Sequence, residues 1–465
     1  MTEPLSYDVL VIGSGPAGQK AAIQAAKSGR RVAVVEREPE VGGACVHRGT
    51  IPSKTLREGA LQLDRFKRSA TMLDVSLRSG FEIPSLMQKI DQVVGAHVGY
   101  ITDQLKRNGV TCYHGRAGFV SDHAVEVVAP DRSVRRLTAD VIVIATGSKP
   151  RTPDTIPVDH EHILDSDSIV SMSYLPRSLA VLGGGVIACE YASIFAALGV
   201  TVTVIDRAPR PLQFMDRELT DRFLHSFERK GGCYLADQSS FTVTWDGVSK
   251  VVTTLADGRV VETDKMLVAF GRTANLEGLH VEAAGVTVSE RGTLPVDAHY
   301  RTNVSHIYAV GDVIGPPALA ASAMEQGRRA VRHALGLGPG AASEFTPIGV
   351  YTIPEMASVG ITEEEAIARH GSAVVGRALF TEVARGQISG IHDGMLKLVT
   401  DPQGKKLLGA HIIGDGATEL IHVGQMGLIT GCDVDVFVES IFNFPTLAES
   451  YRVAALDVVK RRPAR

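Results

Sequence analysis

Short apolar runs that end at a glycine recur along this chain, and they predict buried parallel strands. The first, Asp8–Ile12, is apolar after its first residue and leads directly into Gly13-Ser-Gly15-Pro-Ala-Gly18. A run rich in β-branched residues, without polar alternation, is typical of a strand covered on both faces. An alanine-rich stretch over 19–28 predicts a helix, and a second run over 31–35 predicts a strand that ends at Glu36. The pattern predicts a β-α-β unit.

The three glycines of this unit have the spacing of a dinucleotide-binding turn. Gly13 is suited to the tight turn, Gly15 to close approach of a pyrophosphate, and Gly18 to packing of helix against strand. The free N–H groups at the helix N-terminus favour phosphate, and Glu36 can accept both hydroxyls of a ribose. A glycine triplet alone could be an ordinary turn, but the flanking strand, helix and acid favour a nucleotide site.

The same pattern occurs a second time. The run Ser178–Leu182 leads into Gly183-Gly-Gly185-Val-Ile-Ala188, and a predicted helix and strand then end at Asp206. Gly13 corresponds to Gly183 and Glu36 to Asp206, so both landmarks are displaced by 170 residues. An internal repeat of this kind predicts two nucleotide sites, one in each of two domains.

Composition narrows the class of protein. A length of 465 residues predicts about three domains, and 44% hydrophobic with 22% charged residues is typical of a globular protein. The net charge of −4 gives no electrostatic basis for binding nucleic acid or an anionic membrane. The five cysteines are scattered, so neither a structural disulfide nor a metal site is expected. The N-terminal residues lack a signal-peptide pattern, and no run is long enough for a membrane helix, so a cytoplasmic protein is expected.

The segment Gly42–Lys54 carries the most specific resemblance. Its sequence, Gly-Gly-Ala-Cys-Val-His-Arg-Gly-Thr-Ile-Pro-Ser-Lys, resembles the active-site helix of the pyridine nucleotide-disulfide oxidoreductases, flavoenzymes that include lipoamide dehydrogenase and glutathione reductase. In those enzymes two cysteines separated by four residues form a redox-active disulfide beside FAD. Here Cys45 is present, but Thr50 stands at the second position. This variant is similar to that of the soluble pyridine nucleotide transhydrogenases of the same family.

The resemblance extends over the whole chain and implies an α/β fold. It implies two Rossmann-like dinucleotide-binding domains, one for FAD and one for NAD(P), plus a C-terminal α+β dimerisation domain. The expected FAD-binding domain is split between 1–150 and 276–345, with the NAD(P)-binding domain at 151–275 and the dimerisation domain at 346–465. A glycine-rich loop, 336–343, is a plausible boundary. The expected assembly is a homodimer or a higher homo-oligomer.

The resemblance also implies a set of cofactor-binding residues. For FAD these are Gly13, Gly15, Gly18, Glu36, Gly42, Gly43, Cys45, Lys54, Thr146, Gly147, Gly311, Asp312 and Ala320. For NAD(H) and NADP(H), which are the expected substrates, they are Gly183, Gly185, Ala188, Glu190, Asp206, Arg207, Gly271 and Arg272. Asp312 would hold the ribityl chain, and the helix that starts at Ala320 would point its positive N-terminus at the flavin.

Three residues are the expected catalytic groups. By resemblance, the Lys54 ammonium lies beside the reactive flavin nitrogen, where it would stabilise electron density on the ring, and Glu190 is its ion-pair partner. Cys45 has two interpretations. It could be a thiolate that forms a charge-transfer pair with the flavin, or it could be an inert, small buried residue.

Two substitutions separate this chain from the disulfide reductases of the family. Thr50 cannot close a disulfide, and Phe444, just before Pro445, stands where those enzymes carry a catalytic histidine oriented by a glutamate that matches Glu449. Both indicate that dithiol chemistry is absent. The resemblance then implies hydride transfer between NADPH and NAD⁺ through FAD. An NAD(P)H:quinone reductase or diaphorase on the same scaffold stays open, whereas two complete nucleotide fingerprints argue against a non-enzymatic flavoprotein subunit.

The residues after the second unit bear on nucleotide choice. Asp206 favours NAD, because an acid at this place binds the ribose hydroxyls and repels a 2′-phosphate. Arg207 and Arg210 follow closely, and a guanidinium can grip a phosphate through two parallel hydrogen bonds. This composition is compatible with a site that accepts both nucleotides, and equally with two solvated surface arginines.

Overall fold

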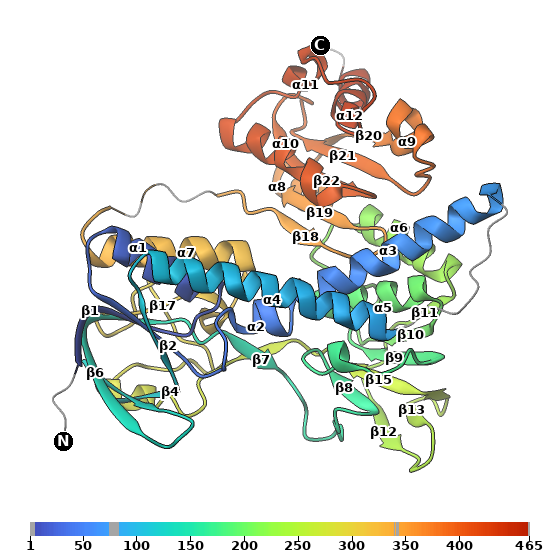
Figure 1. Ribbon diagram of the computed structural model, residues 1–465. Coiled ribbons are helices and arrows are strands. Elements are labelled where there is room, and N and C mark those ends of the chain that lie inside the picture. Colours follow the sequence, from blue (N-terminus) through green and yellow to red (C-terminus); the bar gives the residue numbers. More distant parts are fainter. Residues whose placement is uncertain (1–4, 74–82, 339, 341–343, 464–465) are drawn as a thin grey trace.

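The computed structural model describes residues 5–73, 83–338, 340 and 344–463. The first four residues and part of the predicted boundary loop, namely 339 and 341–343, lie outside the described residues. Figure 1 shows two sheet-containing units in blue to yellow and a C-terminal lobe in orange and red that stands on one side of them.

The first unit is built on a seven-stranded sheet. Its order is β3-β2-β1-β6-β5-β4, with β17 paired to β6. The parallel strands are β1 (Leu5–Ile12), β2 (Val32–Glu36), β3 (Thr111–His114), β6 (Val134–Ile144) and β17 (Ile307–Ala309). The strands β4 (Arg116–Ser121) and β5 (Ala124–Val128) form an antiparallel extension of β6. The sheet therefore joins residues from both parts of the predicted split domain.

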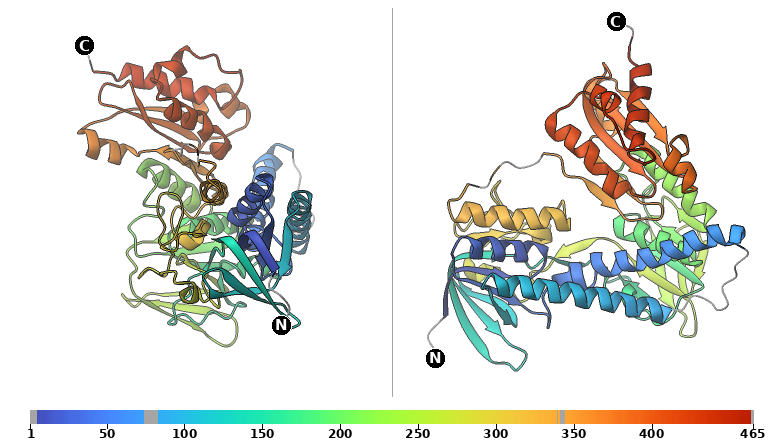
Figure 2. Two further views of the ribbon diagram at one scale, coloured as in Figure 1. Left: turned by 90° about the vertical axis from the view of Figure 1, so that its left-hand side faces the viewer. Right: turned by 45° about the horizontal axis from the view of Figure 1, so that its top comes forward.

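Two helices from distant parts of the sequence lie side by side on this sheet. Figures 1 and 2 show α1 (Pro16–Lys27) beside α7 (Ala320–Ala334). Gly327 permits this contact, because a Cβ on it would lie 2.2 Å from the carbonyl oxygen of Ala17. The helix α4 (Ile83–Arg107) also packs against α1. Helix α1 begins three residues before the predicted 19–28, because Pro16 is well tolerated in a first helical turn.

The second unit repeats the arrangement with a five-stranded parallel sheet of order β11-β10-β9-β15-β8. Its strands are β8 (Ile163–Asp165), β9 (Ser178–Leu182), β10 (Thr201–Ile205), β11 (Gly232–Leu235) and β15 (Lys265–Val268), and its helices are α5 (Val186–Leu198) and α6 (Arg217–Arg229). A small antiparallel sheet follows, made of β12 (Phe241–Trp245), β13 (Val251–Leu255) and β14 (Val260–Thr263). The predicted β-α-β repeat is thus present in three dimensions.

A two-stranded antiparallel ribbon connects the two units. It is formed by β7 (Ser148–Pro150) and β16 (Arg272–Ala274). The predicted domain boundaries at 150 and 275 fall at the ends of these strands, and they stay predictions. Short 3₁₀ helices complete the two units at η1 (Ile169–Ser171), η2 (Val281–Ala284) and η3 (Gly311–Ile314).

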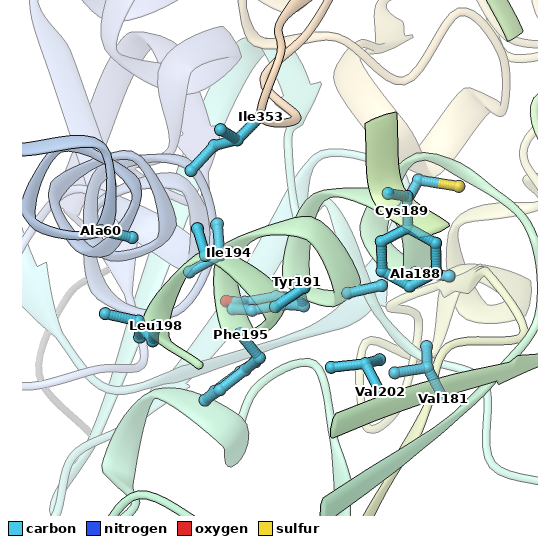
Figure 3. Packing of buried hydrophobic residues seen from close by; sticks show 14 of the residues in the cluster. Ala60, Val181, Ala188, Cys189, Tyr191, Ile194, Phe195, Leu198, Val202 and Ile353 are labelled. Atoms are coloured by element: carbon cyan, nitrogen blue, oxygen red, sulfur yellow. The ribbon is translucent and has the colours of Figure 1, made fainter. Parts of the chain in front are cut away.

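The helix α5 forms the centre of a core that extends into the neighbouring parts of the chain. Figure 3 shows its apolar side chains packed on Val181 and Val202 of the sheet, with Ala60 of α3 (Thr50–Leu73) and Ile353 on the other side. Cys189 is buried here, and burial raises the pKa of its thiol. The continuous core holds α3 firmly against the second unit.

The C-terminal lobe is an antiparallel sheet of order β18-β19-β22-β21-β20 with helices packed on it. The strands are β18 (Ile348–Val350), β19 (Met356–Gly360), β20 (Val374–Leu379), β21 (Met395–Thr400) and β22 (Leu407–Ile413). The helices are α8 (Glu363–His370), α9 (Ala384–Ile388), α10 (Ala417–Thr430), α11 (Asp435–Glu439) and α12 (Glu449–Lys460), with the 3₁₀ helix η4 at Phe380–Glu382. Buried Tyr451 links α12 to α10 by donating its hydroxyl hydrogen to the Leu420 carbonyl at 2.8 Å.

Two apolar side chains of this lobe are at least three-quarters exposed. Ile441 is 96% and Phe444 is 75% exposed, and both lie between α11 and α12. Neighbouring exposed apolar side chains are an expected feature of an interface with another chain. None of the helices in the described part of the chain has the length and apolar character that crossing a bilayer requires.

Candidate functional site

A cavity of about 610 Å³ opens where the N-terminal ends of α1, α3, α5 and α7 converge. The predicted residues that line it are Gly13, Gly15, Glu36, Gly43, Cys45, Lys54, Thr146, Gly147, Glu190, Arg272, Gly311, Asp312 and Ala320. The predicted residues that do not line it are Gly18, Gly42, Gly183, Gly185, Ala188, Asp206, Arg207 and Gly271. The structure therefore gathers most of the predicted FAD residues in one place and leaves most of the second unit's residues outside it.

The glycine turn of the first unit leaves room for a ligand at one side of the cavity. Gly13 has φ +102°, and a Cβ on it would lie 2.4 Å from the Ala145 carbonyl oxygen. A Cβ on Gly18 would lie 1.9 Å from the carbonyl oxygen of Gly13, so Gly18 brings helix against strand. Gly15 differs, because no atom beyond its own residue and its two chain neighbours lies within 4 Å of its added Cβ, although it lines the cavity. The space beside Gly15 is available to a ligand.

The acid at the end of β2 is held in place before any ligand binds. One oxygen of Glu36 accepts hydrogen bonds from the Ser14 amide at 2.9 Å and the Ser14 hydroxyl at 2.6 Å, and the other accepts one from the Glu38 amide at 2.9 Å. The Ser14 hydroxyl in turn accepts the Gly42 amide at 3.0 Å. A carboxylate has about four acceptor positions, so capacity remains for a ribose hydroxyl. Gly42 therefore does not line the cavity but helps to orient Ser14, which holds Glu36.

The cavity also contains polar groups suited to FAD. The buried Thr146 hydroxyl has no hydrogen-bond partner among the described residues. Asp312 accepts a hydrogen bond from the Ser148 hydroxyl at 2.7 Å, and Ala320 starts a helix without a side-chain cap. An uncapped helix N-terminus favours negative charge, and a buried orphan hydroxyl favours a polar ligand atom. These residues, with the open space at Gly15, fit the pyrophosphate and hydroxyl groups of FAD.

The predicted ion pair between Lys54 and Glu190 is present. The Lys54 ammonium lies 2.7 Å from a carboxylate oxygen of buried Glu190, which joins α3 to α5. The other oxygen of Glu190 accepts the Tyr351 amide at 2.8 Å, and the Lys54 nitrogen lies 4.8 Å from the centre of the Tyr351 ring. The charge on Lys54 is therefore fixed at the cavity wall by contacts from three parts of the chain. The sequence interpretation missed Tyr351, which lies within the predicted dimerisation domain, 346–465.

Cys45 lies beside Thr50 rather than beside a second thiol. It belongs to α2 (Gly43–His47), and Thr50 is the first residue of α3. Burial raises the pKa of the Cys45 thiol, and the Thr50 hydrogen bond and the Lys54 charge offset this only in part. All five cysteines are free. The neutral thiol is thus the favoured form in the structure, which supports the inert interpretation over the thiolate.

The second unit reproduces the turn but presents it differently. Gly183 has φ +107°, with an added Cβ 2.7 Å from the Ala269 carbonyl oxygen, and Gly185 has no atom within 4 Å of its added Cβ. Asp206 is half-buried and accepts hydrogen bonds from the Tyr234 hydroxyl at 3.0 Å and the Arg207 amide at 2.9 Å. The Arg207 side chain is exposed. Gly183 is buried, whereas Gly185, Asp206 and Arg207 are exposed or partly exposed outside the cavity.

The structure argues against Arg210 as a ligand for a 2′-phosphate. Its guanidinium donates to the carbonyl oxygens of Gln213 at 3.1 Å and Met215 at 3.2 Å and to the Thr220 hydroxyl at 2.8 Å. These bonds turn the arginine back into its own loop, where Leu212 has φ +49°. Of the two arginines considered for the 2′-phosphate, Arg207 is therefore the one whose side chain is exposed and available.

Arg272 is similarly engaged. It donates to the hydroxyl of Ser148 at 2.8 Å, to the carbonyl oxygen of Ser148 at 2.9 Å and to Asp167 at 3.1 Å. It therefore ties β16 to β7 at the connection between the units, and Gly271 supplies the turn before it with φ +91°. The binding roles of all the predicted residues stay predictions.

The comparisons with known proteins agree with this arrangement. The model for "Pyridine nucleotide-disulphide oxidoreductase" matches residues 7–327, and that for the dimerisation domain of the same family matches residues 346–455. The chain is 42% identical over 460 residues to a protein of Mycobacterium tuberculosis named soluble pyridine nucleotide transhydrogenase, with 98% of each chain covered. It is 41% identical to the protein of that name from Ectopseudomonas mendocina, with 98% of this chain and 99% of the relative covered.

Solved structures of similar fold include LpdA from Mycobacterium tuberculosis, with a TM-score of 0.89 and 29% identity over 97% of this chain and 99% of that one. Another is the HOCl-induced flavoprotein disulfide reductase RclA from Escherichia coli, with a TM-score of 0.87 and 26% identity over the same shares. The predicted fold class and the predicted class of enzyme, an FAD-dependent oxidoreductase that uses pyridine nucleotides, are confirmed. This chain belongs to the pyridine nucleotide-disulfide oxidoreductase family.

Proposed function

We propose that this protein is an FAD-dependent NAD(P)⁺ transhydrogenase that transfers a hydride between NADPH and NAD⁺ without a redox disulfide. The observation that carries the proposal is Cys45, whose neighbour is the hydroxyl of Thr50 instead of a thiol, in a cavity that keeps the Lys54–Glu190 ion pair. Electrons therefore have no disulfide to enter. The relatives that share 41–42% identity are named soluble pyridine nucleotide transhydrogenases.

The C-terminal lobe supports the same conclusion. Phe444 can neither accept nor donate a proton, and Glu449 accepts the Thr446 amide at 3.2 Å at the start of α12. Glu449 thus has a structural partner. A reaction in which a hydride enters from one nucleotide and leaves to another needs no acid or base for a substrate thiol, so the loss of the histidine is consistent with this activity.

The residues have distinct tasks in this proposal. FAD, when bound, supplies the reversible hydride chemistry. The turn at Gly15, the carboxylates of Glu36 and Asp312 and the hydroxyl of Thr146 would hold it. Lys54 supplies a positive charge whose position is fixed beforehand by Glu190 and Tyr351, and a fixed charge stabilises electron density without reorganisation. The neutral thiol of Cys45 adds no competing negative charge.

The nicotinamide nucleotides would bind at the glycine turn of the second unit, one after the other. Asp206 would hold the ribose hydroxyls of NAD(H), and Arg207 would contact the 2′-phosphate of NADP(H). Val186 and Glu190 belong to the first turns of α5, the helix that follows this glycine turn, and both line the cavity. Helix α5 therefore connects the nucleotide site with the cavity.

The assembly is a further part of the proposal. The match to a dimerisation domain supports association of identical chains. We propose a homodimer in which Ile441 and Phe444 are covered by the partner, in the cytoplasm and without nucleic-acid or membrane partners. Sedimentation should give at least twice the 49.5 kDa of one chain, and a fully active monomer would contradict the proposal.

Steady-state kinetics of the purified holoprotein test the function. NADPH is the donor, and a thio-NAD⁺ analogue, quinones and lipoamide compete as acceptors. Transfer to thio-NAD⁺ with no turnover of lipoamide is expected. Faster turnover with quinone would favour a quinone reductase, and no turnover with any acceptor would favour a binding subunit. An anaerobic dithionite titration should show uptake of about two electrons per FAD, and uptake of about four would require a redox disulfide.

A further inference from the structure

Three potential metal ligands meet at one corner of the first unit, outside the cavity. Asp122 and His123 lie in the turn between β4 and β5, and His306 comes just before β17. One possible ligand atom from each residue lies within 4.8 Å of the other two, and within the described chain this is the group that meets that condition. Asp122 and His123 are exposed and His306 is partly exposed, so an ion can reach them from solvent.

Hydrogen bonds to backbone carbonyls fix the tautomers of both histidines. Nδ1 of His123 lies 2.8 Å from the carbonyl oxygen of Ala139, and Nε2 of His306 lies 3.0 Å from the carbonyl oxygen of Asp122. A carbonyl only accepts, so each of these nitrogens carries its hydrogen. Nε2 of His123 and Nδ1 of His306 then keep their lone pairs. Histidines that bind metals are usually oriented in this way, with the second nitrogen donating to a carbonyl or carboxylate.

The two rings are also held next to each other. Their centroids lie 3.7 Å apart, with an angle of 2° between the planes. A metal bonded to both rings lies near both ring planes, so the parallel rings must tilt toward a shared ion. Tetrahedral Zn–N bonds place neighbouring ligand atoms about 3.3 Å apart. The three possible ligand atoms lie within 4.8 Å of one another, so a shared ion would draw them closer together. Both histidines lie in turns and neither side chain is buried, so the tilt does not have to displace core side chains.

We propose that Asp122, His123 and His306 form a binding site for a divalent late transition-metal ion such as Zn²⁺, Ni²⁺ or Cu²⁺, with water completing the coordination. Two imidazoles and one carboxylate suit these ions better than Mg²⁺ or Ca²⁺, which prefer oxygen ligands. The ion would join the β4–β5 turn to the segment that enters β17. That strand leads to Gly311 and Asp312 of the cavity, so the ion would stabilise the frame of the cavity without touching it.

A second stacked pair of histidines provides a matched control. The rings of His299 and His333 are 4.2 Å apart with an angle of 6°, and Nδ1 of His333 is bonded to the Tyr308 hydroxyl at 3.0 Å. The described residues place no third ligand with them in a group that could hold a metal. If any stacked pair bound metal, the two pairs would behave alike.

The test is calorimetric titration of the EDTA-treated holoprotein with Zn²⁺, in a background of Cys112→Ser and Cys233→Ser that removes the two exposed thiols. One Zn²⁺ per chain is expected, with affinity reduced at least about 10-fold in His123→Gln and in His306→Gln. Zinc should also raise the melting temperature of the parent and not of these variants. The control His299→Gln/His333→Gln should bind as the parent does.

Electron paramagnetic resonance with Cu²⁺ provides an independent measurement on the protein with its histidines unchanged. Coupling to two imidazole nitrogens supports the site, and absence of nitrogen coupling overturns it. The proposal is also overturned if His123→Gln and His306→Gln bind Zn²⁺ as tightly as the parent. Equal loss of binding in the control pair overturns it as well.

Discussion

The two dinucleotide-binding units share a backbone and differ in what surrounds it. Gly13 and Gly183 have φ of +102° and +107°, and each approaches a carbonyl oxygen of the neighbouring strand. At Gly15 and at Gly185, no atom beyond the chain neighbours lies within 4 Å of an added Cβ. Only the first turn, however, lines the cavity. The same local sequence pattern thus produces one enclosed site and one open site.

The acids of the two units show the same difference. Glu36 is buried and held by three hydrogen bonds, two from Ser14 and one from the Glu38 amide. Asp206 is half-buried and is followed by an exposed arginine. A preorganised, enclosed site lowers the cost of holding a ligand permanently, whereas an open site allows exchange. We infer that the first unit is built to retain its cofactor and the second to exchange substrates.

The largest expected effect concerns how the second unit is anchored. Asp216, which caps α6, is fully buried, and its carboxylate lies 2.8 Å from Lys397 of the C-terminal sheet. Lys397→Met should lower the free energy of unfolding by about 3–5 kcal/mol, because the buried carboxylate keeps backbone N–H donors but loses its charged partner. Denaturant unfolding followed by circular dichroism measures this change.

A lysine of the second unit provides a matched control. Lys250 forms a half-exposed ion pair with Asp264 at 2.6 Å, so Lys250→Met should change the free energy of unfolding by at most about 1 kcal/mol. Equal losses in the two variants would show that Lys397 is not a special anchor. FAD content should stay normal in both, since neither lysine lines the cavity.

The next effect concerns the ion pair that joins the units. Lys54→Met should slow flavin reduction by NADPH on the order of 10²–10³-fold while FAD remains bound, because a preorganised charge is lost. Stopped-flow absorbance of the flavin band gives the rate. Lys149→Met is the control, since Lys149 lines the same cavity but pairs with exposed Glu277 at 3.0 Å. An unchanged rate of flavin reduction in Lys54→Met would show that the lysine has a structural role and not a catalytic one.

The comparison shows which features a sequence can predict. The strands, the glycine turns and the repeat have short-range patterns, and the structure has them at the expected places, with helix starts shifted by a few residues. The Lys54–Glu190 contact followed from a family motif. The Lys397–Asp216 contact had no such signal, because its residues are 181 positions apart and carry no periodicity. The hydrogen bonds that Arg210 makes to its own loop and to Thr220 also had no sequence signal, since they depend on the turn at Leu212.

Adding one methyl group to each unit separates their roles. The backbone at Gly15 and Gly185 has φ of −65° and −81°, which alanine adopts readily, so both variants should fold. Gly15→Ala should weaken FAD binding by about 1–3 kcal/mol, or roughly 5- to 150-fold, because the methyl group occupies the ligand's space. Gly185→Ala should raise KM for both nucleotides and leave FAD content unchanged. The assignment of the two units would be reversed if Gly185→Ala lost FAD and Gly15→Ala did not.

The smallest expected effect concerns a single exposed side chain. Arg207 is solvent-exposed beside Asp206, and Arg210 is bonded into its own loop. If Arg207 contacts the 2′-phosphate, Arg207→Ala removes one charged hydrogen bond, worth about 1.5 kcal/mol at an exposed site, or roughly 10-fold. KM for NADPH should rise by this factor while KM for NADH stays the same, because NADH has no phosphate there. Arg210→Ala should instead disturb the loop and change both nucleotides alike. Equal changes in KM for the two nucleotides in Arg207→Ala would show that Arg207 does not bind the 2′-phosphate. A wild-type protein that used one nucleotide alone would contradict the transhydrogenase proposal itself.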